Sequence, residues 1–159
     1  MLPLLHIPDG FLAPQVALAL WVVTAVVLGV SLRAIGSGAS ADVGASAPRS
    51  RGILMGISGA FIFAAQMFNF PVAAGTSGHL LGGVLAGTLL GPWAGSVVMA
   101  TVIGIQALLF QDGGLLALGA NIFNMGVIGT LGGTLVARGI GTTLGDTPRA
   151  SRLGVGIAA

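Results

Sequence analysis

The chain alternates long apolar segments with short stretches rich in Gly, Pro, Ser and Asp. Residues 13–32 form an apolar run of about the twenty residues that a helix needs to cross a bilayer core. Further runs cover 52–67 and 115–137, and no Asp, Glu, Lys or Arg occurs from Gly52 to Gln111. This pattern predicts an all-α, polytopic transmembrane bundle that forms a single domain over residues 1–159.

The apolar stretch 79–110 is longer than one crossing requires, and Gly91-Pro92 interrupts it. We interpret it as two short crossings hinged at that dipeptide. Glycines recur there at four-residue spacing, which predicts close helix packing in lipid (Gly83, Gly87, Gly91 and Gly95). Residues 153–159 resemble the first turns of another helix. We therefore expect about five spans and the start of a truncated sixth.

Arginines set the expected topology, because positive residues favour cytoplasmic loops. Arg33, Arg49 and Arg51 flank or lie in a linker rich in Gly, Ser and Ala, which predicts a flexible cytoplasmic loop at 34–51. The amino terminus, with the segment 1–12, then lies outside. The two-crossing interpretation of 79–110 also places the remaining arginines inside.

The same topology assigns the two later loops. Residues 68–78 form an outer loop, on the side of the amino terminus. Residues 139–152 form a cytoplasmic loop, next to Arg138 and containing Arg149 and Arg152.

Composition supports a membrane protein and excludes several classes. The chain is 55% hydrophobic and 6% charged, whereas an ordinary soluble domain has about a quarter of its residues charged. We expect a multi-pass protein of a prokaryotic cell membrane, in contact with lipid. The absence of cysteine removes thiolate sites and cysteine nucleophiles. The net charge of +2 arises from arginines that report topology, so we expect no nucleic-acid partner.

The only two histidines, His6 and His79, lie in unusual loops, HIPDGFL and NFPVAAGTSGHLLGG. An ionisable group beside a long uncharged region is a candidate functional residue. A lone histidine can equally be a hydrogen-bonded residue at a helix end. Because the expected topology places both on the outer side, we predict that they share one site.

Five polar residues are candidates to support that site. Asp9 either orients an imidazole or simply belongs to a Pro-Asp-Gly turn. Gln66 and Asn69 lie at the outer end of the second span, where they either hydrogen-bond the site or satisfy loop backbone groups. Thr76 and Ser77 precede an apolar run, and either is suited to cap a helix beginning near His79.

Three further polar residues are interpreted as structural. Asn121 and Asn124 lie three residues apart in a predicted span, where buried amides commonly bridge helices. Asp112 is expected in a turn or at a helix end.

Three motifs together resemble the CbiM/NikM family of substrate-binding membrane subunits in energy-coupling-factor cobalt and nickel transporters. They are HIPDGFL at 6–12, NFPVAAGTSGHLLGG at 69–83 and QDGGLLALGANIFNMG at 111–126. The resemblance runs from residue 6 to about residue 139 and implies an α-helical bundle with no enzymatic activity. Its implied partners are a transmembrane coupling subunit, ATPase subunits and a small accessory membrane subunit. The chain has no G-x-x-x-x-G-K-[ST] motif, so a partner must hydrolyse ATP.

The resemblance also implies a metal site. In the family, a starting Met-His supplies an amine, an amide nitrogen and an imidazole to one divalent ion, and the TSGH histidine supplies a fourth nitrogen. Here the imidazoles are His6 and His79, and the ion is transported Co²⁺ or Ni²⁺ with no prosthetic group. Leu5 stands where the family has Met, so we hypothesise that translation starts at residue 5, or that proteolysis exposes it.

Other functions stay open. Nickel specificity is an alternative to cobalt, because the same nitrogens bind both ions. A channel or secondary carrier predicts charged residues inside the spans, which the apolar runs lack. A membrane enzyme using His79 as a base lacks a nearby nucleophile. An inactive, truncated remnant of the family is the remaining alternative.

Overall fold

A computed structural model describes residues 6–38, 48–68, 70–73 and 76–144. Its elements follow in the order α1 (Pro14–Gly36), α2 (Pro48–Gln66), β1 (Phe70–Ala73), β2 (Thr76–Gly78), α3 (Gly83–Leu90), α4 (Pro92–Phe110), α5 (Leu118–Asn121), η1 (Ile122–Gly132) and α6 (Gly133–Leu144). The last three are consecutive, and η1 is a π-helix. Apart from the two short strands, the described secondary structure is helical.

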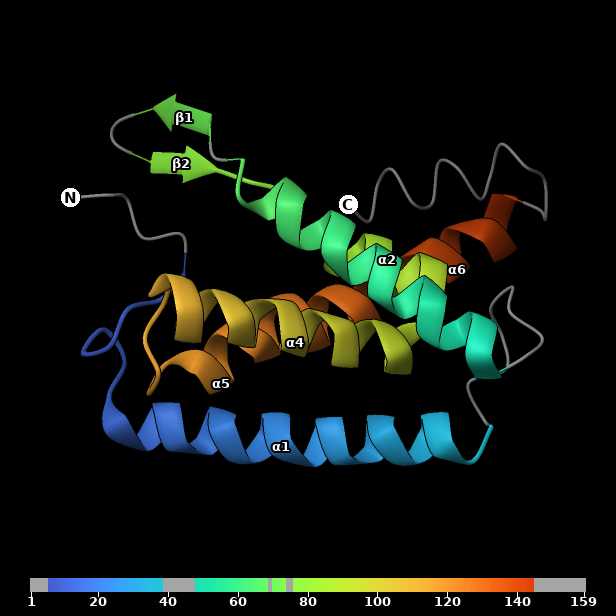
Figure 1. The fold of residues 1–159 in the computed structure, drawn as a ribbon, viewed down its shortest axis with the longest axis horizontal. Coiled ribbons are helices and arrows are strands. Elements are labelled where there is room, and N and C mark those ends of the chain that lie inside the picture. The colour runs from blue at the N-terminus through green and yellow to red at the C-terminus, as the bar shows by residue number, and fades with distance from the viewer. Residues whose placement is uncertain (1–5, 39–47, 69, 74–75, 145–159) are drawn as a thin grey trace.

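Helix α4 forms the centre of the bundle, between α1 on one side and α2 on the other (Figure 1). It also contacts α3, α5 and η1. Its Met99 and Ile103 side chains are fully buried, as is Ile62 of α2. The core is therefore built around the uncharged stretch that the sequence shows between Gly52 and Gln111.

The predicted break at Gly91-Pro92 is confirmed. Gly91 has φ +78°, a left-handed conformation that favours glycine, and it ends α3. Pro92 occupies the first turn of α4, where its missing N–H is harmless. The eight residues of α3 rise only about 12 Å as a helix, well short of a hydrocarbon core of about 30 Å.

Three helices in the described part of the chain are long and apolar enough to cross a membrane. They are Pro14–Gly36, Pro92–Phe110 and the continuous helix Leu118–Ile140. Several large apolar side chains of α1 are exposed, as expected of a lipid-facing helix: Val16, Leu18, Val22, Val23, Val26 and Val30. The count of five crossings and the outward amino terminus stay predictions.

The connections differ from the sequence-based expectations in three places. The outer loop predicted at 68–78 contains an antiparallel hairpin in which Phe70 pairs with Gly78. The cytoplasmic loop predicted from residue 139 is wrong at its start, because α6 continues to Leu144. The loop predicted at 34–51 is shorter, since α1 ends at Gly36 and α2 begins at Pro48. The expected sixth helix at 153–159 lies outside the described residues.

Candidate functional site

The two histidines come together at one end of the bundle. His6 lies in the segment that precedes α1, and His79 lies between β2 and α3. Their ring centroids are 5.8 Å apart, with an angle of 50° between the ring planes. The predicted proximity of His6 and His79 is confirmed, although they are separated by two helices and a hairpin in the chain.

The imidazole of His6 is buried and has unusual surroundings. Its side chain is 1% exposed, and Nδ1 lies 3.2 Å from a carboxylate oxygen of Asp112. The contact is close enough for an ion pair but is not aligned as a hydrogen bond. Neither ring nitrogen has a hydrogen-bond partner in the described part of the chain. Buried polar atoms without partners are uncommon, and an ion is one of the groups that would satisfy them.

Burial favours the neutral form of this imidazole. Burial lowers the pKa of His6 below its ordinary value of 6.5, because the charged form is poorly solvated there. The Asp112 carboxylate acts in the opposite direction without overcoming burial, and His79 adds to the lowering. A neutral imidazole retains the lone pair that a metal ion requires.

His79 has one nitrogen engaged and one available. Its Nδ1 lies 2.9 Å from the carbonyl oxygen of Leu80. A carbonyl only accepts hydrogen bonds, so Nδ1 carries the proton in this contact, and the neutral ring with this tautomer has its lone pair on Nε2. Metal-binding histidines commonly donate their other ring N–H to a carbonyl or carboxylate in this way.

Asn121 ties the His6 segment to the long helix that begins at Leu118. The Ile7 N–H donates to Asn121 Oδ1 at 3.0 Å, and Asn121 Nδ2 donates to the Ile7 carbonyl at 3.1 Å. The Gly114 N–H donates to the same carbonyl at 2.9 Å. Gly113 has φ +103°, and a Cβ on it would lie 2.7 Å from the His6 Cβ. These contacts fix the backbone directly after His6.

The sequence leaves two roles open for Asp9, orienting an imidazole or belonging to a turn, and in the structure its side chain binds backbone N–H groups. Its carboxylate accepts hydrogen bonds from the N–H groups of Leu115 (3.0 Å), Leu116 (2.8 Å) and Ala117 (3.1 Å). These N–H groups precede the helix that begins at Leu118, where a carboxylate is favourable. The carboxylate beside His6 is instead that of Asp112. The residues around Asp112 indicate only a turn or a helix end, so this contact was not expected from the sequence.

Replacing Asp9 by Ala is expected to lower the free energy of unfolding by about 1 kcal/mol, because backbone N–H groups in the turn before Leu118 lose their acceptor. The Asp9→Asn variant keeps an acceptor oxygen and should lose less, because only the charge is removed. Chemical unfolding in detergent micelles, followed by circular dichroism, measures both. Equal stability of Asp9→Ala and the unmodified protein would contradict this role.

Two glutamines support the loop that carries His79. Gln66 Nε2 donates to the Leu81 carbonyl at 2.8 Å, and Gln106 Nε2 donates to Gln66 Oε1 at 3.1 Å. Both side chains are fully buried. Of the two roles considered for Gln66, the structure shows the second, because its side chain satisfies a backbone group of the loop that carries His79. Gln106 was not expected, although an amide within an otherwise apolar span is a usable signal.

The remaining supporting residues contribute differently from the predictions. The predicted capping role of Thr76 and Ser77 is wrong, because both belong to β2 and α3 begins only at Gly83. Gly82, with φ +78°, occupies the capping position. Asn69 and Leu5 lie outside the described residues. Among the described side chains, no group of three or more His, Cys, Asp or Glu residues is placed to hold a metal.

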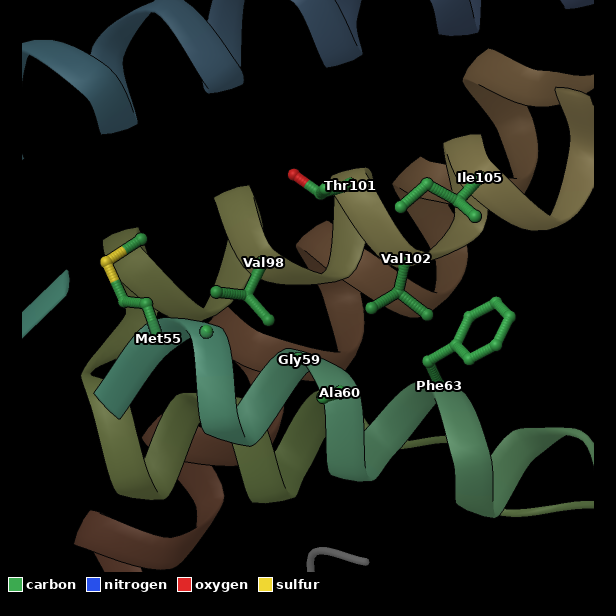
Figure 2. A pocket seen from close by; sticks show the side chains of 9 residues that line it. Met55, Gly59, Ala60, Phe63, Val98, Thr101, Val102 and Ile105 are labelled. Carbon is green, nitrogen blue, oxygen red and sulfur yellow. The ribbon is translucent and has the colours of Figure 1, made fainter. Parts of the chain in front are cut away.

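A separate cavity of about 390 Å³ lies between α2 and α4, lined by Met55, Gly56, Gly59, Ala60, Phe63, Val98, Thr101, Val102 and Ile105. Figure 2 shows that apolar side chains surround it, with the Thr101 hydroxyl as the one polar side-chain group among those labelled. That hydroxyl donates to the Val97 carbonyl. This cavity is therefore unsuited to a metal ion, and the histidine pair is the better candidate.

Comparison with known proteins gives consistent matches. The family described as "Cobalt uptake substrate-specific transmembrane region", CbiM, matches residues 6–159. The crystal structure of a truncated transition metal transporter is similar in fold, with a TM-score of 0.81 and 36% identity, covering 97% of this chain and 68% of that one.

Two relatives are similar in sequence over 111 residues each. A protein of Haloquadratum walsbyi that is named for metal transport is 47% identical, covering 70% of this chain and 47% of the relative. A fused nickel transport protein of Rhodobacter capsulatus is 35% identical, covering 70% of this chain and 30% of the relative. The matched segment thus spans half or less of the length of these relatives.

Proposed function

Because the chain belongs to the CbiM family, we propose that it is the metal-binding, substrate-specific subunit of an energy-coupling-factor importer for Co²⁺ or Ni²⁺. Its cargo would bind between His6 and His79. The description of the family, which refers to cobalt uptake, and the name of the Rhodobacter capsulatus relative, which refers to nickel transport, support this class of cargo.

One observation carries the proposal: the buried His6 ring lies beside the His79 ring, with the two ring centres 5.8 Å apart. With metal–nitrogen bonds of about 2.1 Å, two imidazoles on one ion have ring centres about 4.5 to 6.5 Å apart. The observed separation of 5.8 Å lies in this range. The separation of the two rings is therefore compatible with one ion shared by both histidines.

The chemistry of the donors favours a late first-row divalent ion. Imidazole nitrogen suits Ni²⁺ and Co²⁺, whereas Mg²⁺ and Ca²⁺ prefer oxygen. The resemblance implies two further nitrogens, the backbone amide nitrogen of His6 itself and a free amine on the residue directly before it. The same set of nitrogens binds cobalt and nickel, so the proposal covers both ions.

Capture at the outer face is supported by the position of the arginines. His6 precedes the first residue of α1, and Arg33 lies in its last turn, about 30 Å away along a helix of this length. The helix that starts at Leu118 has Asp9 beside its first residue. Arg138 lies near the other end of that helix. By the positive-inside rule, the end with the arginines faces the cytoplasm and the histidines face outward.

The proposal includes partners that supply energy. We propose that a transmembrane coupling subunit and ATPase subunits receive the loaded chain, and that a small accessory membrane subunit takes part. An isolated capture subunit needs only a site and a membrane anchor, which the histidine pair and the three apolar helices would provide.

Equilibrium dialysis of the purified chain in detergent micelles tests the proposal. We expect one Co²⁺ or Ni²⁺ ion per chain at micromolar concentrations and no binding of Mg²⁺ under the same conditions, because the donors are nitrogens. Failure to bind either transition metal would contradict the proposal.

A further inference from the structure

We propose that Asn121 and Gln66 are positioning residues: two amide clamps that hold the loops of His6 and His79 at the separation that one shared ion requires. This inference rests on the proposed function, because it assigns the clamps a role in metal binding. It replaces the interpretation of Asn121 as a simple bridge between helices.

The first clamp acts on the backbone next to His6. Asn121 is 4% exposed, and its amide both accepts from the Ile7 N–H and donates to the Ile7 carbonyl. A primary amide carries one acceptor and one donor group at the spacing of a backbone peptide, so it can engage both groups of a single residue. Neither Asp nor Leu of similar size reproduces both bonds. Rotation of the backbone at Ile7 would move His6, and the clamp prevents it.

The second clamp acts two residues after His79. The Leu81 carbonyl can only accept, so Gln66 must present Nε2 to it. Gln66 Oε1 then faces Gln106, which must present its own Nε2. Both amide orientations follow from this one carbonyl. The loop that carries His79 is thereby held to α2, and α2 in turn to α4.

The glutamine pair is costly as a purely structural device. With its orientation fixed, Gln106 Oε1 is left buried without a hydrogen-bond partner among the described residues. An unpaired buried acceptor is destabilising, and a pair of apolar side chains would avoid it. The polar pair therefore defines one position of the loop rather than adding to stability.

The clamps also explain how distant segments produce one site. Asn121 lies at the end of α5, Gln66 at the end of α2 and Gln106 in the last turns of α4. The separation of the imidazoles is therefore determined by how these helices pack, rather than by the loops alone.

The test uses Asn121→Leu and Gln66→Leu, with Asn124→Leu as the matched control. Asn124 lies on the same helix as Asn121 but is exposed. For each protein, Co²⁺ affinity and the Co²⁺ absorption spectrum are measured in detergent, together with hydrogen exchange of the 6–12 and 79–83 segments.

We expect Co²⁺ affinity to fall about 10- to 100-fold in both clamp variants and to stay unchanged in Asn124→Leu. The Co²⁺ spectrum of Asn121→Leu should approach that of His6→Ala, and that of Gln66→Leu should approach that of His79→Ala. Exchange should accelerate at the Ile7 amide in Asn121→Leu and around Leu81 in Gln66→Leu. A residue with only a structural role would lower stability without changing the spectrum.

The outcomes separate the inference from the function on which it rests. If the unmodified protein does not bind Co²⁺, the proposed function fails. If it binds and both clamp variants retain its affinity and spectrum, only the positioning role is overturned. Unchanged exchange at the Ile7 amide in Asn121→Leu overturns the first clamp in either case.

Discussion

The His79→Ala variant should lose at least about 100-fold in affinity for Co²⁺ and Ni²⁺, while its helical content stays the same. Removal of an outer-shell partner alone typically costs 10- to 100-fold, and His79 would be a direct ligand. The ring is only partly buried and lies in a loop, so its loss leaves no large cavity in the helical core. Isothermal titration calorimetry in detergent measures the affinity, and circular dichroism checks the fold.

Leu80→Ala provides the control for this prediction. Leu80 is the next residue in the same loop, and its side chain is 41% exposed. Its affinity should match that of the unmodified protein, because the contact to His79 Nδ1 comes from the Leu80 backbone carbonyl. Undiminished binding in His79→Ala would remove His79 from the site. A similar loss in Leu80→Ala would point to general disruption of the loop.

The second large effect concerns packing and is expected at Gly95. A Cβ at this position would lie 2.9 Å from backbone atoms of Ala86 and Gly87, so Gly95→Ala requires α3 and α4 to separate. Overpacking of this kind costs about 1 to 3 kcal/mol, and backbone atoms cannot turn aside as a side chain can. The free energy of unfolding in detergent micelles measures the loss.

Gly104→Ala is the matched control, because Gly104 lies on the same helix and a Cβ there would have nothing within 4 Å. Alanine is favoured over glycine in a helix by about 1 kcal/mol, so this variant should be as stable as the unmodified protein or more stable. Equal stability of Gly95→Ala and Gly104→Ala would contradict the close contact between α3 and α4.

The main features of the fold were predictable where a local signal determines the structure. The break between α3 and α4 follows from Gly91 and Pro92, whose backbone preferences require no tertiary information. The continuation of α6 to Leu144 was missed because arginine is compatible with a helix, so Arg138 marks topology without marking a helix end. The π-helical geometry of η1 had no recognised signal in the sequence.

The site was predictable only in part, for a related reason. The membrane topology expected from the arginines placed His6 and His79 on the same side of the membrane. In the structure their rings are neighbours. The identity of their polar neighbours depends on how residues 111–121 fold against the amino-terminal segment. Asp9 and Asp112 therefore could not be assigned from the sequence, because a carboxylate in a turn serves equally well as a helix cap or as a partner for an imidazole.

The most direct test of the central claim is to count the imidazoles bound to the metal. X-ray absorption spectroscopy of the Ni²⁺-loaded protein detects histidine rings through their multiple-scattering features. Two imidazoles are expected in the unmodified protein and one in each of His6→Ala and His79→Ala, provided that these variants are loaded at high metal concentration. A spectrum with one imidazole or none in the unmodified protein would show that the two histidines do not share the ion.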